Sequence, residues 1–148
     1  MKRPPLAALM ATPEEIEAQF YEALQTADLE RLMALWLDDE FVRCIHPGGP
    51  LLVGASAIRA GFEALFGRGP VNVQAAEVKK LVTEQLCLHQ VQERVIVPGP
   101  EGGAQVAWVL ATNAYLRTAQ GWRMVLHHAS PGQAATAPEI VPGTAVLH

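Results

Sequence analysis

The spacing of hydrophobic residues changes once along this chain, near residue 71. Before that point apolar residues recur every three or four positions, as in Ile16, Phe20 and Leu24, which is the period of a helix with one buried face. After it the period falls toward two and valine becomes frequent, which is typical of β-strands. Helices grouped before strands predict an α+β fold, because α/β folds interleave the two.

Local signals place the expected elements. The sequence Thr12-Pro13-Glu14-Glu15 is a capping box with proline at the first helical position, so a helix begins at residue 13. Asp28 is suited to cap a second, short helix, and Ser56 to cap a third helix over 55–66. Valine-rich segments between Gly and Pro turn signals predict the strands. These strands are expected over residues 41–45, 71–82, 86–97, 105–118 and 122–129.

Length and charge exclude several classes of protein. The 148 residues predict a single domain, 1–148, with a core over 11–131 and a tail over 132–148. The net charge is −4 and no basic stripe is present, so no nucleic-acid partner is expected. No apolar run is long enough to cross a membrane, and the run over 6–11 is too short for a signal peptide. With only two cysteines, a cytoplasmic protein is expected.

Several short motifs follow one another along this chain, and their order and spacing are informative. They are Ala27-Asp28-Leu29-Glu30, Leu35-Trp36, Cys44-Ile45-His46-Pro47-Gly48-Gly49, Gly54, and Gly121-Trp122-Arg123 leading to His127-His128-Ala129-Ser130. Over residues 13–131 the chain resembles the SnoaL-like branch of the NTF2-like superfamily. The resemblance implies an α+β cone, in which three N-terminal helices pack in a curved antiparallel β-sheet. It also implies a mostly apolar pocket at the open end and a homodimer through the outer sheet face.

The ketosteroid isomerase branch of that superfamily offers a mechanism to test. It uses a tyrosine and a protonated acid to stabilise the dienolate, and an aspartate as base. Matching the motifs puts Phe20 at the tyrosine position and Cys44 or His46 at the aspartate position. Phenylalanine has no hydrogen-bond donor, and Tyr21 is turned about 100° away along the helix. The isomerase mechanism is therefore disfavoured.

A different acid–base group is available beside the His-Pro-Gly turn. Cys44 and His46 alternate onto one face of their strand and line the implied pocket, where an imidazole suits proton transfer near neutral pH. In the alternative, which we prefer, Cys44 is a small buried hydrophobe and His46 is a turn residue that bonds the backbone.

The pair His127–His128 cannot form one mononuclear metal site, because neighbouring side chains of a strand point to opposite faces. No metal and no cofactor are expected. A two-residue loop at 120–121 sets Asn113 opposite His128, whereas a three-residue loop at 119–121 sets it opposite His127. We favour His128 and place this pair at the polar end of the pocket. In the alternative, Asn113 and the histidine are a buried polar pair whose only role is to hydrogen-bond each other.

Other candidate residues are assigned as follows. His89, Val91 and Glu93 share one strand face, which we interpret as a solvated or interface face with a salt bridge. Trp36 follows Leu32 at helical spacing, so it is first a core residue and second a pocket wall. The predicted catalytic residues are His46, Asn113 and His128. The predicted ligand-binding residues are Phe20, Trp36, Cys44, Phe62 and Tyr115.

Two functions remain open. The first is a protein that binds a small, mostly apolar molecule in its cone and performs acid–base chemistry of the isomerase, cyclase or dehydratase type. The second is a non-catalytic ligand-binding or dimeric scaffold domain, in which Phe20, Phe62 and Phe66 fill the cone. A homodimer is expected in both, because 106–111 is apolar on both faces of its strand and one face would otherwise be an exposed patch.

Overall fold

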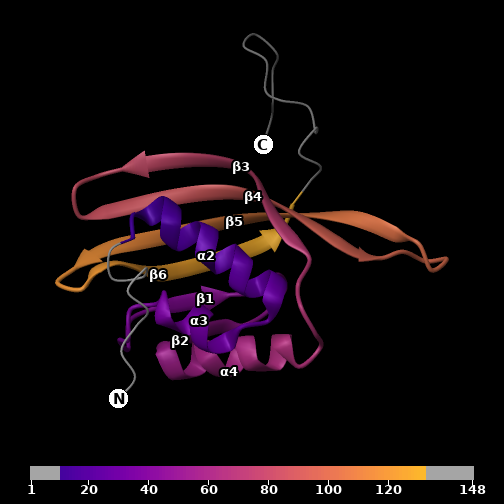
Figure 1. Ribbon diagram of the computed structural model, residues 1–148, viewed down its shortest axis with the longest axis horizontal. Coiled ribbons are helices and arrows are strands. Elements are labelled where there is room, and N and C mark those ends of the chain that lie inside the picture. The colour runs from indigo at the N-terminus through magenta and orange to yellow at the C-terminus, as the bar shows by residue number, and fades with distance from the viewer. Residues whose placement is uncertain (1–10, 133–148) are drawn as a thin grey trace, which may run out of the picture.

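A computed structural model describes residues 11–132 of the chain (Figure 1). The predicted tail over 132–148 lies almost wholly outside these residues, as does the run over 6–11 except for Ala11. The helices are α2 (Pro13–Thr26), α3 (Leu29–Ala34) and α4 (Ala55–Phe66). The strands are β1 (Arg43–Ile45), β2 (Leu51–Val53), β3 (Val73–Val82), β4 (Leu86–Pro98), β5 (Ala104–Thr118) and β6 (Gly121–Pro131).

The helix starts follow the capping signals of the sequence in two cases out of three. The side chain of Thr12 accepts a hydrogen bond from the backbone N–H of Glu15, and that of Asp28 accepts one from Arg31. The prediction for Ser56 is wrong, because α4 begins after Gly54 and has no side-chain cap. Gly54 has a φ of 92°, a left-handed conformation that glycine adopts without a steric cost.

The strands form one six-stranded sheet with the order β2-β1-β6-β5-β4-β3. All neighbours are antiparallel except β1 and β6, which are parallel. The four long strands β3 to β6 form the antiparallel sheet that we expected, and β1 adds one parallel pair at the side of β6. The strand β2 was not predicted, because its pairing with β1 and not its own composition makes it a strand.

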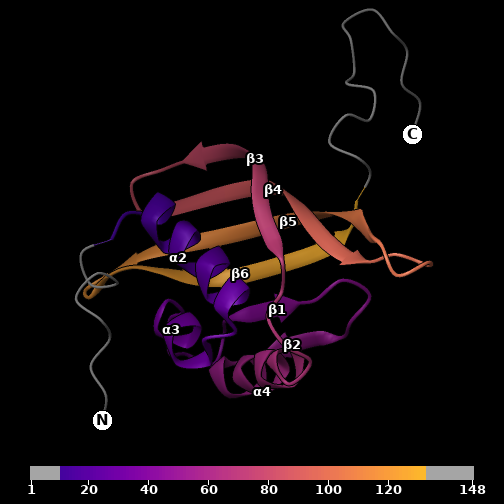
Figure 2. The same cartoon turned by 45° about the vertical axis from the view of Figure 1, so that its right-hand side comes forward.

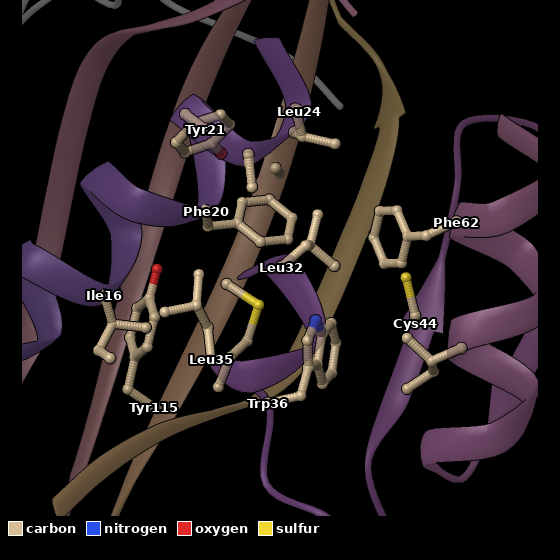
Figure 3. Close-up of a cluster of buried hydrophobic side chains, with 14 of the residues drawn as sticks. Ile16, Phe20, Tyr21, Leu24, Leu32, Leu35, Trp36, Cys44, Phe62 and Tyr115 are labelled. Carbon is tan, nitrogen blue, oxygen red and sulfur yellow. The ribbon is translucent and has the colours of Figure 1, made fainter. Parts of the chain in front are cut away.

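The sheet curves around the helices, as expected for an NTF2-like α+β cone (Figures 1 and 2). Helix α2 lies across the inner face of β4, β5 and β6, while α3 and α4 pack beside β1 and β2. Buried side chains from all three helices meet in the core (Figure 3), among them Phe20 of α2, Leu32 of α3 and Phe62 of α4. None of the described helices is long and apolar enough to cross a membrane.

Candidate functional site: a buried polar network under helix α2

Helix α2 presents two polar side chains to the sheet. Glu17 and Tyr21 are four residues apart, so they lie one above the other on the same helix face. Both are buried, with 6% and 4% of their surface exposed. Their neighbours on this face, Ile16 and Phe20, are completely buried. The helix is therefore anchored to the sheet by polar as well as apolar side chains.

Three polar residues of neighbouring strands lie in a row on the sheet face under α2. His89 of β4 pairs with Asn113 of β5, and Asn113 pairs with His127 of β6. Paired positions of neighbouring strands lie on the same face, which here is the face under α2. Glu93 and Tyr115 join this face from further along β4 and β5, because every second residue of a strand points the same way. The buried polar network is Glu17, Tyr21, His89, Glu93, Asn113, Tyr115 and His127.

Glu17 is the centre of this network, because three donors converge on its atom Oε2. The hydroxyl of Tyr115 lies 2.6 Å away, Nδ1 of His89 2.9 Å and Nδ2 of Asn113 3.2 Å. A buried carboxylate is costly unless donors replace its lost water, and these three do so. The second ring nitrogen of His89, Nε2, lies 3.5 Å from the exposed carboxylate of Glu14 but is buried and forms no hydrogen bond within the described residues.

A second carboxyl group, that of Glu93, lies at the other end of the network. Its Oε2 accepts a 2.6 Å hydrogen bond from the hydroxyl of Tyr21, which in turn accepts one of 3.2 Å from Asn113. Burial is the main cause that raises the pKa of Glu93 to about 7; the Tyr21 bond lowers this pKa in part, and the nearby Glu17 adds to the rise. Burial also holds the pKa of Tyr21 well above its usual range. Near neutral pH, Glu93 is therefore able both to give and to take a proton.

His127 closes the network toward the hydrophobic core. Its Nδ1 lies 2.6 Å from Oδ1 of Asn113, and its ring centre lies 4.9 Å from that of Phe20. Burial lowers the pKa of His127 to about 3, helped by the nearby His46 and His128. The ring is consequently neutral at physiological pH.

The candidates at the His-Pro-Gly turn lie next to this end of the network. Cys44 pairs with His127 across β1 and β6, and its Sγ lies 3.9 Å from Nε2 of His46. The ring of His46 packs edge-on against Phe62, toward which Cys44 also points (Figure 3). Burial raises the pKa of Cys44 to about 12 and lowers that of His46. Cys44 is thus a buried thiol and not a thiolate nucleophile.

The register of the last hairpin overturns our preference for His128. The turn is a two-residue loop at residues 119–120, one residue earlier than the two-residue loop that we favoured, and Thr118 pairs with Gly121. Continued unchanged, this register would set Leu126 opposite Asn113. A bulge at Ala114/Tyr115 shifts it by one residue and brings His127 opposite Asn113. His128 pairs with Thr112 on the outer face and is exposed.

The interpretation of β4 was also wrong. His89 and Glu93 do share one face, but that face is buried under α2, with His89 completely inaccessible and Glu93 only 6% exposed. The four residues that the sequence did not assign to a site are Glu17, Tyr21, His89 and Glu93. The available signal was the i, i+4 spacing of Glu17 and Tyr21 around Phe20, matched by the four-residue spacing of His89 and Glu93.

The five residues predicted to bind the ligand are all buried: Phe20, Trp36, Cys44, Phe62 and Tyr115. Tyr115 belongs to the polar network, while the other four belong to the adjacent core. Trp36 is notable, because its indole Nε1 is buried and has no hydrogen-bond partner within the described residues. The role of these five residues in binding a ligand stays a prediction.

Among residues 11–132, no group of three or more His, Cys, Asp or Glu side chains has the arrangement needed to hold a metal ion. A surface depression lined by Asp38, Asp39 and Glu40 contains none of the predicted site residues.

Comparison with known proteins identifies the family. The family model described as the SnoaL-like domain matches residues 14–134, which is most of the chain. The chain belongs to the SnoaL-like family. No curated protein matches it. As a SnoaL-like domain of the NTF2-like superfamily, it has a fold that supports a ligand-binding or isomerase-type role.

Two solved structures illustrate the range of proteins similar to this SnoaL-like chain. One, from Thiobacillus denitrificans, is provisionally assigned as a calcium/calmodulin-dependent protein kinase type II association domain. It is 41% identical, with 82% of this chain and 96% of that chain covered and a TM-score of 0.74. The other, from Streptomyces avermitilis, is provisionally assigned as a dehydratase of the NTF2-like family. It is 30% identical, with 80% and 93% covered and a TM-score of 0.71.

Proposed function

We propose that this SnoaL-like domain holds a small, mostly apolar molecule against the buried polar network and transfers a proton to or from it. The observation that carries the proposal is Glu93, a buried carboxyl group with a pKa of about 7 that is held by the hydroxyl of Tyr21. A general acid–base group works best when its pKa lies near the working pH. Strongly shifted carboxyl groups of this kind concentrate at functional sites.

The surroundings of the network fit an apolar ligand. Phe20 and Phe62 contact each other edge to face, and Phe20 contacts His127. Tyr21 and Asn113 bring hydrogen-bonding groups to the same region, as in sites where a few polar groups orient an apolar molecule. The provisional assignment of the Streptomyces avermitilis relative as a dehydratase is consistent, because loss of water needs one group to take a proton and another to give one.

Native mass spectrometry of the freshly purified full-length chain tests whether a ligand is held. We expect a fraction of the protein to exceed the bare mass, and we expect Tyr21→Phe and Glu93→Gln to reduce that fraction. The control is Glu22→Gln on the exposed side of α2. A bare mass in every preparation would count against a retained ligand, and an excess equally present in all four proteins would place the ligand elsewhere.

A second function, that of a dimeric association domain, is favoured by the outer face of the sheet. Leu81, Val106 and Leu110 lie on this face and are 59%, 40% and 44% exposed. Inside, Phe20, Phe62 and Phe66 pack successively against one another, as expected if side chains fill the cone. The relative from Thiobacillus denitrificans is itself provisionally assigned as an association domain. We propose a homodimer through this outer face, which the ligand-binding role also permits.

Light scattering at micromolar concentration tests the dimer. We expect twice the chain mass of 16.0 kDa for the wild type and a shift toward the monomer for Leu110→Lys, because a buried unpaired charge opposes association. Phe41→Lys is the control, since Phe41 is 48% exposed but lies in the loop before β1. A wild-type protein that scatters as a monomer would refute the interface.

A further inference from the structure

We propose that Asn113 fixes His127 as the tautomer protonated on Nδ1, so that the unprotonated Nε2 receives a hydroxyl or N–H donor of the ligand. The tautomer follows from hydrogen bonds within the chain. The assignment of the ligand rests on the proposed function and narrows it to apolar molecules that carry such a donor.

The orientation of the Asn113 amide is the first step. One end of this amide lies 3.2 Å from both Oε2 of Glu17 and the hydroxyl of Tyr21. That carboxylate oxygen already accepts hydrogen bonds from Tyr115 and His89. An amide oxygen at this end would face the carboxylate oxygen with no proton between them, whereas an NH₂ group donates to both neighbours. The NH₂ end therefore faces Glu17, and Oδ1 faces His127.

The tautomer of His127 follows from that orientation. The amide Oδ1 can only accept, so the 2.6 Å contact requires a proton on Nδ1 of His127. A neutral imidazole carries one proton, which leaves a lone pair on Nε2. This Nε2 makes no hydrogen bond to any residue in the described range 11–132. Glu17 thus orients the Asn113 amide, and this amide determines which ring nitrogen of His127 carries the proton.

The surroundings of His127 define the class of ligand. Its ring contacts Phe20, and its cross-strand neighbour is the buried thiol Cys44. A lone pair in apolar surroundings attracts an O–H or N–H donor and repels a carboxylate. An alcohol, a phenol or an enol on an apolar skeleton meets these conditions, whereas the corresponding ether and carboxylate do not.

Nitrogen-15 NMR of the ¹⁵N-histidine-labelled full-length protein at pH 7 tests the tautomer without any ligand. We expect His127, assigned by the loss of its signals in His127→Gln, to show a protonated Nδ1 and an unprotonated Nε2. Asn113→Leu removes the acceptor and is expected to release the proton to Nε2, while Thr112→Val on the outer face changes nothing. A proton on Nε2 in the wild type would overturn the proposal even if Asn113→Leu does not fold.

Titration calorimetry with three probes of one skeleton tests the ligand class. We expect 2-naphthol to bind the wild type about tenfold more tightly than 2-methoxynaphthalene, the effect of one hydrogen bond, and 2-naphthoate not to bind. The preference is expected to disappear in Asn113→Leu and to persist in Thr112→Val. Equal affinity for the first two probes, or binding of neither, would refute the ligand class. The native-mass experiment would still decide the proposed function separately.

Discussion

Replacement of Glu17 by alanine is expected to reduce the free energy of unfolding by about 3–5 kcal/mol. The reason is the convergence of three buried donors on one carboxylate oxygen, since the hydroxyl of Tyr115, Nδ1 of His89 and Nδ2 of Asn113 would all lose their acceptor. An unsatisfied buried donor costs more than the hydrogen bond itself contributes. Urea denaturation of Glu17→Ala and wild type at pH 7 measures the loss.

The matched control for this experiment is Glu22→Ala on the same helix. Glu22 is exposed and forms a 3.1 Å ion pair with Arg31, a surface interaction that contributes little to stability. We expect Glu22→Ala to lie close to the wild type. If Glu17→Ala lost no more stability than Glu22→Ala, the network would not hold α2 to the sheet in solution.

Replacement of Glu93 by glutamine is expected to stabilise the protein at alkaline pH. The folded-state pKa of Glu93 is about 7, above its ordinary value of 4.5, so the folded state favours the protonated form. The wild type therefore loses stability as the pH rises from about 4.5 to 7, because Glu93 must ionise while buried. Glutamine accepts the same bond from Tyr21 and never ionises. The variant should exceed the wild type by about 2–3 kcal/mol at pH 8 and equal it near pH 4.5.

The contribution of His127 to stability changes with pH in the opposite direction. It is the same in the variant and the wild type, so it cancels from their difference. Its folded-state pKa of about 3 lies below its ordinary 6.5, so its contribution to stability is complete above pH 6.5 and is lost as the pH falls. It is present in both proteins. The difference between Glu93→Gln and wild type, measured by denaturation at several pH values, therefore reports on Glu93 alone. A difference between Glu93→Gln and wild type that does not change with pH would contradict the prediction.

The local elements of this fold could be predicted because their signals lie within a few residues of each other. The Thr12 capping box placed the start of α2, and α4 has the bounds that were predicted for the third helix. The fold class followed from the single change of hydrophobic period. The short strand β2 was missed, since its pairing with β1 and not its own composition makes it a strand.

The site was only partly predictable, because it depends on the pairing of strands and not on signals within a few residues. Asn113 was predicted to lie opposite a histidine across the strands, and this pairing is confirmed, while its role in a site stays a prediction. Which histidine it meets depends on the turn, which moves the partner of Asn113 by two residues from the loop we favoured, and on a bulge, which moves it back by one. A net shift of one residue exchanges the two faces of a strand. Sequence alternation cannot show such a shift, so His128 was preferred where His127 lies.

The sequence by itself determined the α+β class, the three helices, the four long strands and the side chains able to transfer protons. Only the tertiary structure decided which of these side chains meet. Glu17 and Tyr21 lie on one helix face, but their partners His89 and Glu93 are each 72 residues further along the chain. Contacts over such separations are set by strand register and helix packing. Burial then gives Glu93 a pKa near neutrality, a property that no residue has before the chain folds.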